Sequence, residues 1–246
     1  MKERAGVVYV TADEMREIDD ITVREFQVDV PMLMENAGRA VADFARRMFQ
    51  GTIFGKHVTV LVGSGNNGGD GMVAARHLAN WGAEINMVLG SVEATMKDAP
   101  LRQLHVLGKM GILTRATDRS LRDNDLLIDA LLGYGLEGNP RDRIATIIKE
   151  ANKSGRPILA LDLPSGMNAT TGEAYDPCIK ATATLTLALP KTGFLAPSAQ
   201  QYVGDLYLAD ISIPRKVYQR FGQQNLLFQK DTIVKVQENI EGLRCT

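Results

Sequence analysis

The chain has 246 residues, a length that fits one large domain or two small ones. Hydrophobic residues make up 45% of the sequence and charged residues 23%, proportions that are ordinary for a globular fold. The formal net charge of −1 excludes a broad basic field for nonspecific binding, so we expect neither nucleic acid nor a membrane as a partner.

Cysteine usage and the N-terminus bear on the compartment. The two cysteines, Cys178 and Cys245, have no metal-ligand spacing, so neither a disulfide framework nor a zinc site is indicated. So few cysteines favour a reducing compartment. The only apolar stretch near the N-terminus, residues 7–10, is too short for a secretory signal, and no stretch is long enough to span a bilayer. We therefore expect a cytoplasmic protein.

Two helices are predicted at the start of the chain. Thr11 and Glu14 form a capping-box pattern at the beginning of a predicted helix over residues 11–25. Pro31 suits the first turn of a second helix, because its missing N–H has no partner there in any case. That helix is expected to end near Phe49.

From His57 onward, short apolar runs alternate with amphipathic segments. This alternation predicts right-handed βαβ units and a mostly parallel sheet covered by helices on both faces. The expected strands cover residues 58–62, 85–89, 112–114, 126–132, 157–161, 181–189 and 206–209, and the expected helices cover 69–81, 96–109 and 141–153.

One domain is expected over residues 1–222. The periodic pattern is lost from Gln223, and the remaining residues are too few to bury a core. Residues 223–246 are therefore interpreted as a tail or linker, without a separate domain.

Three loops carry most of the glycines and acids, and each directly follows a predicted strand. They cover residues 63–71, 133–139 and 162–166. If the strands follow the usual doubly wound order, they are neighbours at the centre of the sheet. The loops would then meet around the crevice where such sheets bind ligands.

The first loop has a phosphate-binding pattern. Gly63, Gly65 and Gly68 satisfy G-x-G-x-x-G between a strand and a helix, so backbone N–H groups can approach an anion at the helix N-terminus. A tight turn in which asparagines adopt left-handed conformations is the alternative. A dehydrogenase would also need an acid at the end of the next strand, where this sequence has Gly90 and Ser91, and a P-loop motif does not occur.

The other two loops hold acids with open roles. Asp129 lies within an apolar strand, where an acid must be paired, hydrogen-bonded or bound to a cation; it either accepts loop N–H bonds or has a functional role. Asp162, at a strand end before Pro164, is a candidate general acid or base, or it caps the turn. Ser165 lies outside a G-x-S-x-G elbow, and none of the three histidines accompanies a matching acid motif, so a hydrolase triad is not indicated.

Five other positions are interpreted more simply. Lys191 follows a strand and could offset phosphate charge, but a solvated surface lysine is favoured. Glu35 and Asn36 face either the crevice or the solvent. Met72 and Trp81 are expected to be core residues.

Several segments together resemble the YjeF N-terminal domain family, the NAD(P)HX epimerases. They are Leu33-Met-Glu-Asn-Ala-Gly-Arg-Ala-Val41, Val62-Gly-Ser-Gly-Asn-Asn-Gly-Gly-Asp-Gly71, Asp129-Ala-Leu-Leu-Gly133, Leu161-Asp-Leu-Pro-Ser-Gly166 and Ala188-Leu-Pro-Lys-Thr-Gly193. The resemblance spans residues 11–214. Neither the asparagine-glycine motif nor Asp-Leu-Pro-Ser-Gly is specific alone, but the combination is.

The resemblance implies a Rossmann-like three-layer α/β/α sandwich that forms a homodimer. It also implies an isomerase of metabolite repair, which interconverts the R and S forms of NADHX and NADPHX, hydrates with a hydroxyl on the nicotinamide ring. A separate NAD(P)HX dehydratase would be its functional partner, because the dehydratase domain often fused to this module is absent from the sequence.

The same resemblance implies roles for individual residues. Asp162 would contact the substrate, and we expect it to shuttle a proton to or from the ring hydroxyl or its water. Oxygen atoms of Asn67, Asp129 and Ser165 would bind a potassium ion, since hard cations prefer oxygen donors. The phosphates and ribose would be bound by Asn66, Asn67, Gly68, Gly69, Asp70, Gly133, Tyr134, Gly135, Leu136, Glu137, Gly138 and Asn139.

One departure and one alternative remain. Many relatives have Gly-Thr-Gly where this chain has Gly133-Tyr134-Gly135, so Tyr134 either stacks on a ring or narrows the pocket. The alternative function is a noncatalytic nucleotide-binding or dimerisation module of the same fold, including an RNA-associated type. That type would lose the glycine-asparagine motif or the Asp162 loop and carry a basic surface, whereas this chain keeps both motifs and a net charge of −1.

Overall fold

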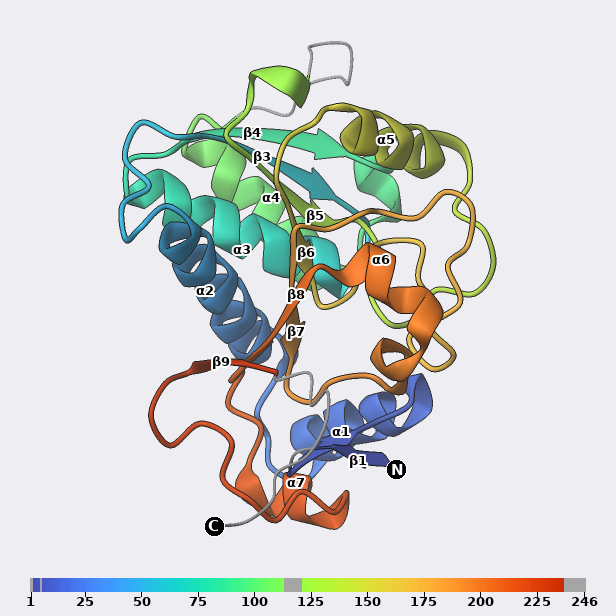
Figure 1. The fold of residues 1–246 in the computed structure, drawn as a ribbon. Coiled ribbons are helices and arrows are strands. Elements are labelled where there is room, and N and C mark those ends of the chain that lie inside the picture. The colour runs from blue at the N-terminus through green and yellow to red at the C-terminus, as the bar shows by residue number, and fades with distance from the viewer. Residues whose placement is uncertain (1, 5, 113–120, 237–246) are drawn as a thin grey trace.

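The computed structural model describes residues 2–4, 6–112 and 121–236, and its centre is a seven-stranded sheet (Figure 1). The strand order is β4-β3-β5-β6-β7-β8-β9; all neighbours are parallel except β9, which pairs antiparallel with β8. The strands are β3 (His57–Val62), β4 (Glu84–Leu89), β5 (Leu126–Ala130), β6 (Ile158–Leu161), β7 (Ala183–Leu187), β8 (Asp205–Ala209) and β9 (Ile233–Lys235). A separate antiparallel pair is formed by β1 (Lys2–Arg4) and β2 (Val7–Tyr9).

Helices cover both faces of the sheet, as the alternation of the sequence predicts. The helices are α1 (Ala12–Arg24), α2 (Val30–Met48), α3 (Asn66–Asn80), α4 (Asp98–Lys109), α5 (Asp142–Lys153), α6 (Gln200–Val203) and α7 (Arg215–Arg220). Along β5, Leu126 and Ile128 join the large core that contains α2, α3 and α4, whereas Leu127 joins the smaller core under α5. This alternation of successive side chains confirms the three-layer α/β/α sandwich.

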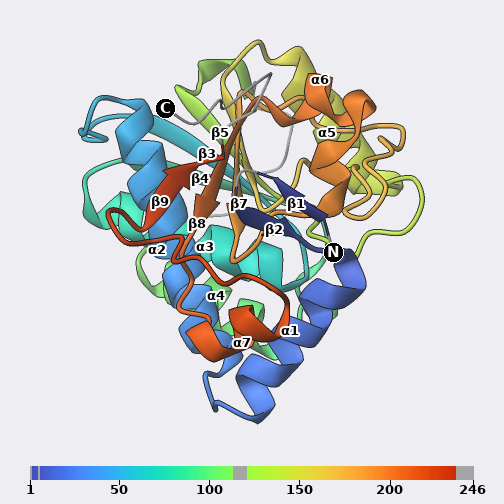
Figure 2. The same ribbon diagram turned by 60° about the horizontal axis from the view of Figure 1, so that its bottom comes forward.

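The first two helices begin where the sequence predicts. Thr11 Oγ1 accepts a hydrogen bond from the Glu14 backbone N–H at 3.2 Å, and the Thr11 N–H donates to the Glu14 carboxylate at 2.7 Å, so the capping box is complete. Asp29 caps α2, which has Pro31 in its first turn. Helix α1 lies beside α7, as Figure 2 shows.

The predicted strands at the centre are confirmed, with one exception that cannot be placed. The strands β3, β5 and β6 are neighbours in the sheet, which is the order that brings the three glycine- and acid-bearing loops together. The expected strand at 112–114 lies for the most part outside the described residues.

Helix α3 begins earlier than the sequence indicates. It starts at Asn66, not at residue 69, with Gly65 as its N-cap. Asparagine and glycine have low helix propensity, which is why the pattern favours a later start. Packing overrides this preference: a Cβ at Gly68 would lie 2.0 Å from the Gly63 carbonyl oxygen, and one at Gly71 would lie 2.4 Å from the Ala130 Cβ. Only glycines allow the first turns to approach β3 and β5 so closely.

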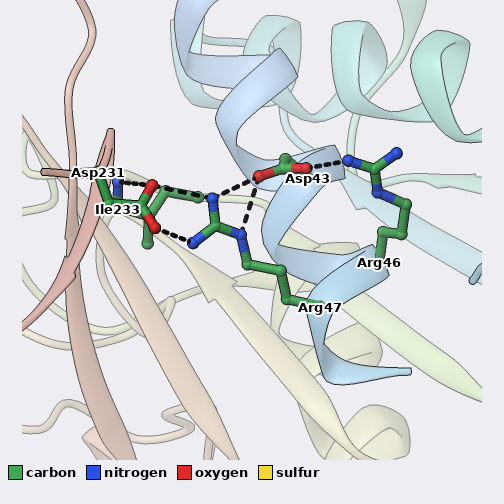
Figure 3. Close-up of polar contacts among 5 residues, drawn as sticks. All are labelled: Asp43, Arg46, Arg47, Asp231 and Ile233. Carbon is green, nitrogen blue, oxygen red and sulfur yellow. Dashed lines mark hydrogen bonds and ion pairs between the residues drawn. The ribbon is translucent and has the colours of Figure 1, made fainter. Parts of the chain in front are cut away.

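The C-terminal segment differs from the expected tail. Residues 233–235 form β9 at the edge of the sheet, and Gln223 is buried. Figure 3 shows how Arg47 of α2 binds both carboxylate oxygens of Asp231, at 2.7 and 3.0 Å, while Asp43 binds Arg46 and Arg47. Residues 223–236 therefore belong to the packed domain, and residues 237–246 lie outside the described part.

Within residues 2–4, 6–112 and 121–236, no helix has the length and apolar character needed to cross a membrane.

We expect Gln223→Ala to lower the free energy of unfolding by about 1–3 kcal/mol, because it leaves a buried backbone N–H without a partner. The Gln223 amide oxygen accepts from the Val8 N–H at 2.8 Å, and its nitrogen donates to the Gly6 carbonyl at 3.1 Å. Urea denaturation measures the change. The exposed neighbour provides the control: Gln224→Ala should change stability by less than about 0.5 kcal/mol. Equal effects of the two substitutions would contradict the expectation.

Candidate active site

A cavity of about 680 Å³ lies at the carboxyl ends of β3, β5 and β6, a volume typical of small-molecule sites. It lies where the strand order changes direction between β3 and β5, the usual ligand position in doubly wound sheets. All three predicted loops contribute to its walls. The contributing residues from these loops are Ser64, Gly65, Asn66, Asn67, Asp70, Gly133, Tyr134, Gly135, Leu136, Glu137 and Asp162.

The N-terminus of α3 forms one end of this cavity. The first backbone N–H groups of a helix have no partner within the helix, and the N-cap Gly65 supplies no side-chain bond to them. Lys97, at the start of α4, also lines the cavity and adds a positive charge. Free backbone N–H groups and a cation at one helix end suit a phosphate group.

This helix end is held in place by the close approach of two backbones. A Cβ on Gly63 would lie 1.8 Å from the Leu131 carbonyl oxygen, so the ends of β3 and β5 are in backbone contact there. Gly68 and Gly69 are packed inside α3, against the Gly63 carbonyl and the Met34 side chain, and do not line the cavity. Their predicted substrate contacts stay predictions.

Asp162 carries a buried charge partner that the sequence analysis did not find. Its side chain is 4% exposed, and its backbone has a φ of +67°, a left-handed conformation that turns the chain sharply at the end of β6. The Oδ1 atom of Asp162 accepts from Lys191 Nζ, from Thr186 Oγ1 at 3.2 Å and from the Leu187 N–H at 3.2 Å. No described residue bonds to Oδ2, which leaves this oxygen for a ligand.

The interpretation of Lys191 as a solvated surface lysine is wrong. It is 1% exposed, lines the cavity, and also donates to Thr186 Oγ1 at 3.2 Å and to the Leu187 carbonyl at 3.1 Å. Burial of an ammonium group is costly unless it is paired, and here the carboxylate of Asp162 pairs it. Its position directly after a strand, like that of Asp162, was the available signal.

The segment before α1 holds the Lys191 loop. The Val10 N–H donates to the Pro190 carbonyl at 2.9 Å, and the Thr192 N–H donates to the Val10 carbonyl at 2.8 Å. Residue 10 therefore pairs with the backbone on both sides of Lys191, which links the segment before α1 to the strand ends that line the cavity.

Two further acids face the cavity. Asp70 of α3 is 8% exposed, and burial together with the charges of Asp162 and Asp19 raises the pKa of its carboxyl well above the usual range. Asp19 of α1 accepts a hydrogen bond from Tyr134 Oη at 2.7 Å, and burial raises its pKa. Tyr134 therefore crosses from the β5 loop to α1 and narrows the cavity, one of its two predicted roles. For Asp19, the available signal in the sequence was its place one turn after Met15, on the apolar side of α1.

Behind the cavity wall, Asp129 and Ser165 form a buried cluster. Asp129 accepts from Ser165 Oγ at 2.6 Å, from the Ser165 N–H at 2.8 Å and from the Leu131 N–H at 3.3 Å. Burial raises the pKa of Asp129 to about 6, although these bonds lower it. Asn67 lies beside Gly133 at the same strand end, and its Nδ2 is buried without a partner among the described residues.

Other predicted residues lie elsewhere. Asn139 accepts from the Asp176 N–H at 3.2 Å, and neither it nor Gly138 lines the cavity. Glu35 faces outward and binds Arg76 and His77, while Asn36 donates to Ser212 Oγ at 2.9 Å. Met72 is a core residue as predicted, whereas Trp81 is only partly buried.

The fold and the cavity define the class: an α/β protein with a ligand site at the switch point of a doubly wound sheet. Comparison with known proteins makes this more specific. Residues 30–193 match the family described as YjeF-related protein N-terminus. The chain belongs to this family.

Curated relatives cover most of the chain. It is 37% identical over 226 residues to the NAD(P)H-hydrate epimerase of Dehalogenimonas lykanthroporepellens, which covers 91% of this chain and 89% of that protein. A protein of the same name from Lentilactobacillus buchneri is 36% identical, over 84% of this chain and 95% of that protein. The bifunctional NAD(P)H-hydrate repair enzyme Nnr of Moorella thermoacetica is 39% identical, but this chain spans only 41% of its length.

A solved structure supports the fold. The crystal structure of the yeast protein YNL200c superposes with a TM-score of 0.81 at 26% sequence identity, covering 94% of this chain and 100% of that one.

We expect Gly63→Ala to destabilise the protein by at least about 2 kcal/mol, because the new methyl group would overlap the Leu131 carbonyl oxygen. Gly65→Ala in the same motif is the matched comparison, since nothing lies within 4 Å of a Cβ there. It should lower stability by less than about 1 kcal/mol. Thermal and urea unfolding measure both variants, and a Gly63→Ala protein as stable as Gly65→Ala would contradict the close approach.

Proposed function

We propose that this protein is an isomerase of metabolite repair that epimerises hydrated nicotinamide cofactor, interconverting the R and S forms of NADHX and NADPHX. The observation that carries the proposal is the similarity over nearly the whole chain to single-domain proteins named NAD(P)H-hydrate epimerase. The cavity supports it, because it joins an anion-binding helix end to a buried acid.

The helix end suits the phosphates of such a substrate. The free N–H groups of α3 and the Lys97 side chain would bind the pyrophosphate. Gly90 and Ser91 follow strand β4 without an acid for a ribose hydroxyl, which distinguishes this pocket from that of a nicotinamide dehydrogenase. The nicotinamide ring would then lie further along the cavity, towards Asp162.

Asp162 is the proposed catalytic residue. Lys191 and two other donors hold its Oδ1, so the carboxylate cannot rotate freely, and the residue lines the cavity with its Oδ2 free of bonds to the described residues. A carboxylate fixed in this way can take a proton from a water molecule or from the ring hydroxyl.

A potassium ion is the proposed cofactor. Asp129 and Ser165 supply buried oxygens, and the Asn67 amide, whose buried Nδ2 has no partner among the described residues, would turn its Oδ1 towards the ion. These residues would hold the ion. When bound, the ion would supply positive charge beside the phosphate-binding loops and offset the buried charge of Asp129.

The expected partners and location are not tested by the structure. The homodimer, the cytoplasmic location and the absence of nucleic acid and membrane partners stay predictions. The chain spans 41% of the length of the bifunctional relative, and a separate NAD(P)HX dehydratase as functional partner stays a prediction.

Purified protein should bring R-enriched or S-enriched NADHX to the equilibrium mixture faster than buffer does, as measured by chromatography. Asp162→Asn should slow this interconversion by about 10²–10⁴-fold, because the amide cannot accept the proton. Asp205→Asn, an exposed position at the start of β8, is the control and should keep the wild-type rate. A wild-type protein that only binds the hydrates would leave the noncatalytic alternative.

Potassium should raise both activity and melting temperature compared with tetramethylammonium at the same ionic strength, because an ion that binds only the folded state stabilises it. Ser165→Ala should increase the potassium concentration needed for half of the stabilisation. Differential scanning fluorimetry measures this without substrate. An identical melting temperature in the two salts would argue against the ion site.

A further inference from the structure

Two carboxyl groups face the same cavity in opposite environments. Asp162 accepts three hydrogen bonds, one of them from the buried ammonium group of Lys191. Asp70 is also more than nine-tenths buried, yet no described residue donates a hydrogen bond to it or pairs with its charge. The first environment stabilises an ionised carboxylate, and the second stabilises a neutral carboxylic acid.

The surrounding charges increase this difference. The groups that face Asp70 across the cavity are Asp19 and Arg16 of α1, Tyr134 and Glu137 of the β5 loop, the Asp162–Lys191 pair and Lys97 of α4. The pKa of Asp70 is raised well above its usual range. Burial is the largest cause, and the negative charges of Asp162 and Asp19 are the next. Of the three positively charged side chains that line the cavity, Lys191 is bound to Asp162, and neither Arg16 nor Lys97 forms an ion pair with Asp70.

The proposed reaction needs two such groups. Hydration of the ring enamine places the hydroxyl on the carbon bonded to the ring nitrogen, because that nitrogen stabilises positive charge there. Inversion at this carbon requires the hydroxyl to leave from one face and water to add from the other. One group must therefore donate a proton and another must accept one.

We propose that Asp70 is the proton donor of the epimerisation, that Asp162 is the acceptor, and that Lys191 is the positioning residue that determines which carboxyl has which role. This inference rests on the proposed function, and it adds a second catalytic residue on a different wall of the cavity. Asp70 comes from α3, which covers one face of the sheet, whereas Asp162 comes from the strand end itself.

Inversion proceeds by loss of water and its return to the opposite face of the ring. Asp70 gives its proton to the ring hydroxyl, the C–O bond breaks, and water leaves while the nitrogen lone pair forms a C=N bond. A water molecule then adds to the same carbon from the other face, the electron pair returns to nitrogen, and the proton goes to Asp162. Asp70 is now ionised and Asp162 is protonated. The reverse turnover, or proton exchange with solvent, restores both groups.

The first experiment substitutes Asp70. Asp70→Asn keeps the shape and removes the acidic proton, so kcat should fall by about 10²–10⁴-fold while KM changes by less than about threefold. Asp70→Glu should restore part of the lost kcat. In the pH profile of wild-type kcat/KM, loss of activity at high pH reports ionisation of the donor, and this limb should disappear in Asp70→Asn. Asp205→Asn is again the matched control.

The second experiment substitutes Lys191 by a neutral residue of similar length. Without the ammonium group Asp162 Oδ1 loses one of its three donors and the carboxylate is held less firmly, so Lys191→Met should lower kcat more than it changes KM. The high-pH limb is assigned to Asp70 and should remain. If this variant does not fold, the Asp70 variants decide the proposal.

The outcomes separate the two proposals. Failure of the wild type to interconvert the R and S forms overturns both. An active wild type with an Asp70→Asn rate within about threefold, or with an unchanged high-pH limb, overturns the role of Asp70 alone. A raised KM with unchanged kcat in Asp70→Asn would show that Asp70 only binds substrate, which also overturns it.

Discussion

The backbone contact between the ends of β3 and β5 is the constraint on which the site depends. Gly63 approaches the Leu131 carbonyl more closely than any side chain would allow, and Gly68 lets the first turn of α3 lie on Gly63. The free N–H groups of the helix are thereby placed beside the loop that follows β5. The same contact brings Asn67 next to Gly133, where both residues line the cavity at the N-terminus of α3.

The second requirement is the buried ion pair between Asp162 and Lys191. Such pairs add little stability compared with apolar residues of the same size, so their presence calls for another explanation. Here the pair lines a cavity and leaves one carboxylate oxygen free for a ligand. With Asp70 unpaired in the same cavity, two carboxyl groups have different environments there, an arrangement that resembles an acid–base site.

Much of the fold follows from the sequence, because the buried strands and amphipathic helices alternate clearly. The three loops were found for the same reason, since each directly follows an apolar run. Lys191 was missed because a lysine is rarely buried, and burial depends on a partner 29 positions away in the sequence. The start of α3 was missed because glycines required for packing look like helix breakers. Strand β9 was missed because three residues at a sheet edge, within a polar segment, carry almost no periodic signal.

The pairing of residue 10 with the backbone around Lys191 has a wider consequence. The same short segment, residues 7–10, is bonded at Val8 to Gln223 from near the other end of the chain. Residues 7–10 thus connect Gln223 to the backbone on both sides of Lys191. Local opening at either end of the chain would loosen Lys191, and a ligand that orders the cavity would slow hydrogen exchange at Val8 and Val10. Residues 7–10, Gln223 and the backbone on both sides of Lys191 are therefore joined by one chain of hydrogen bonds.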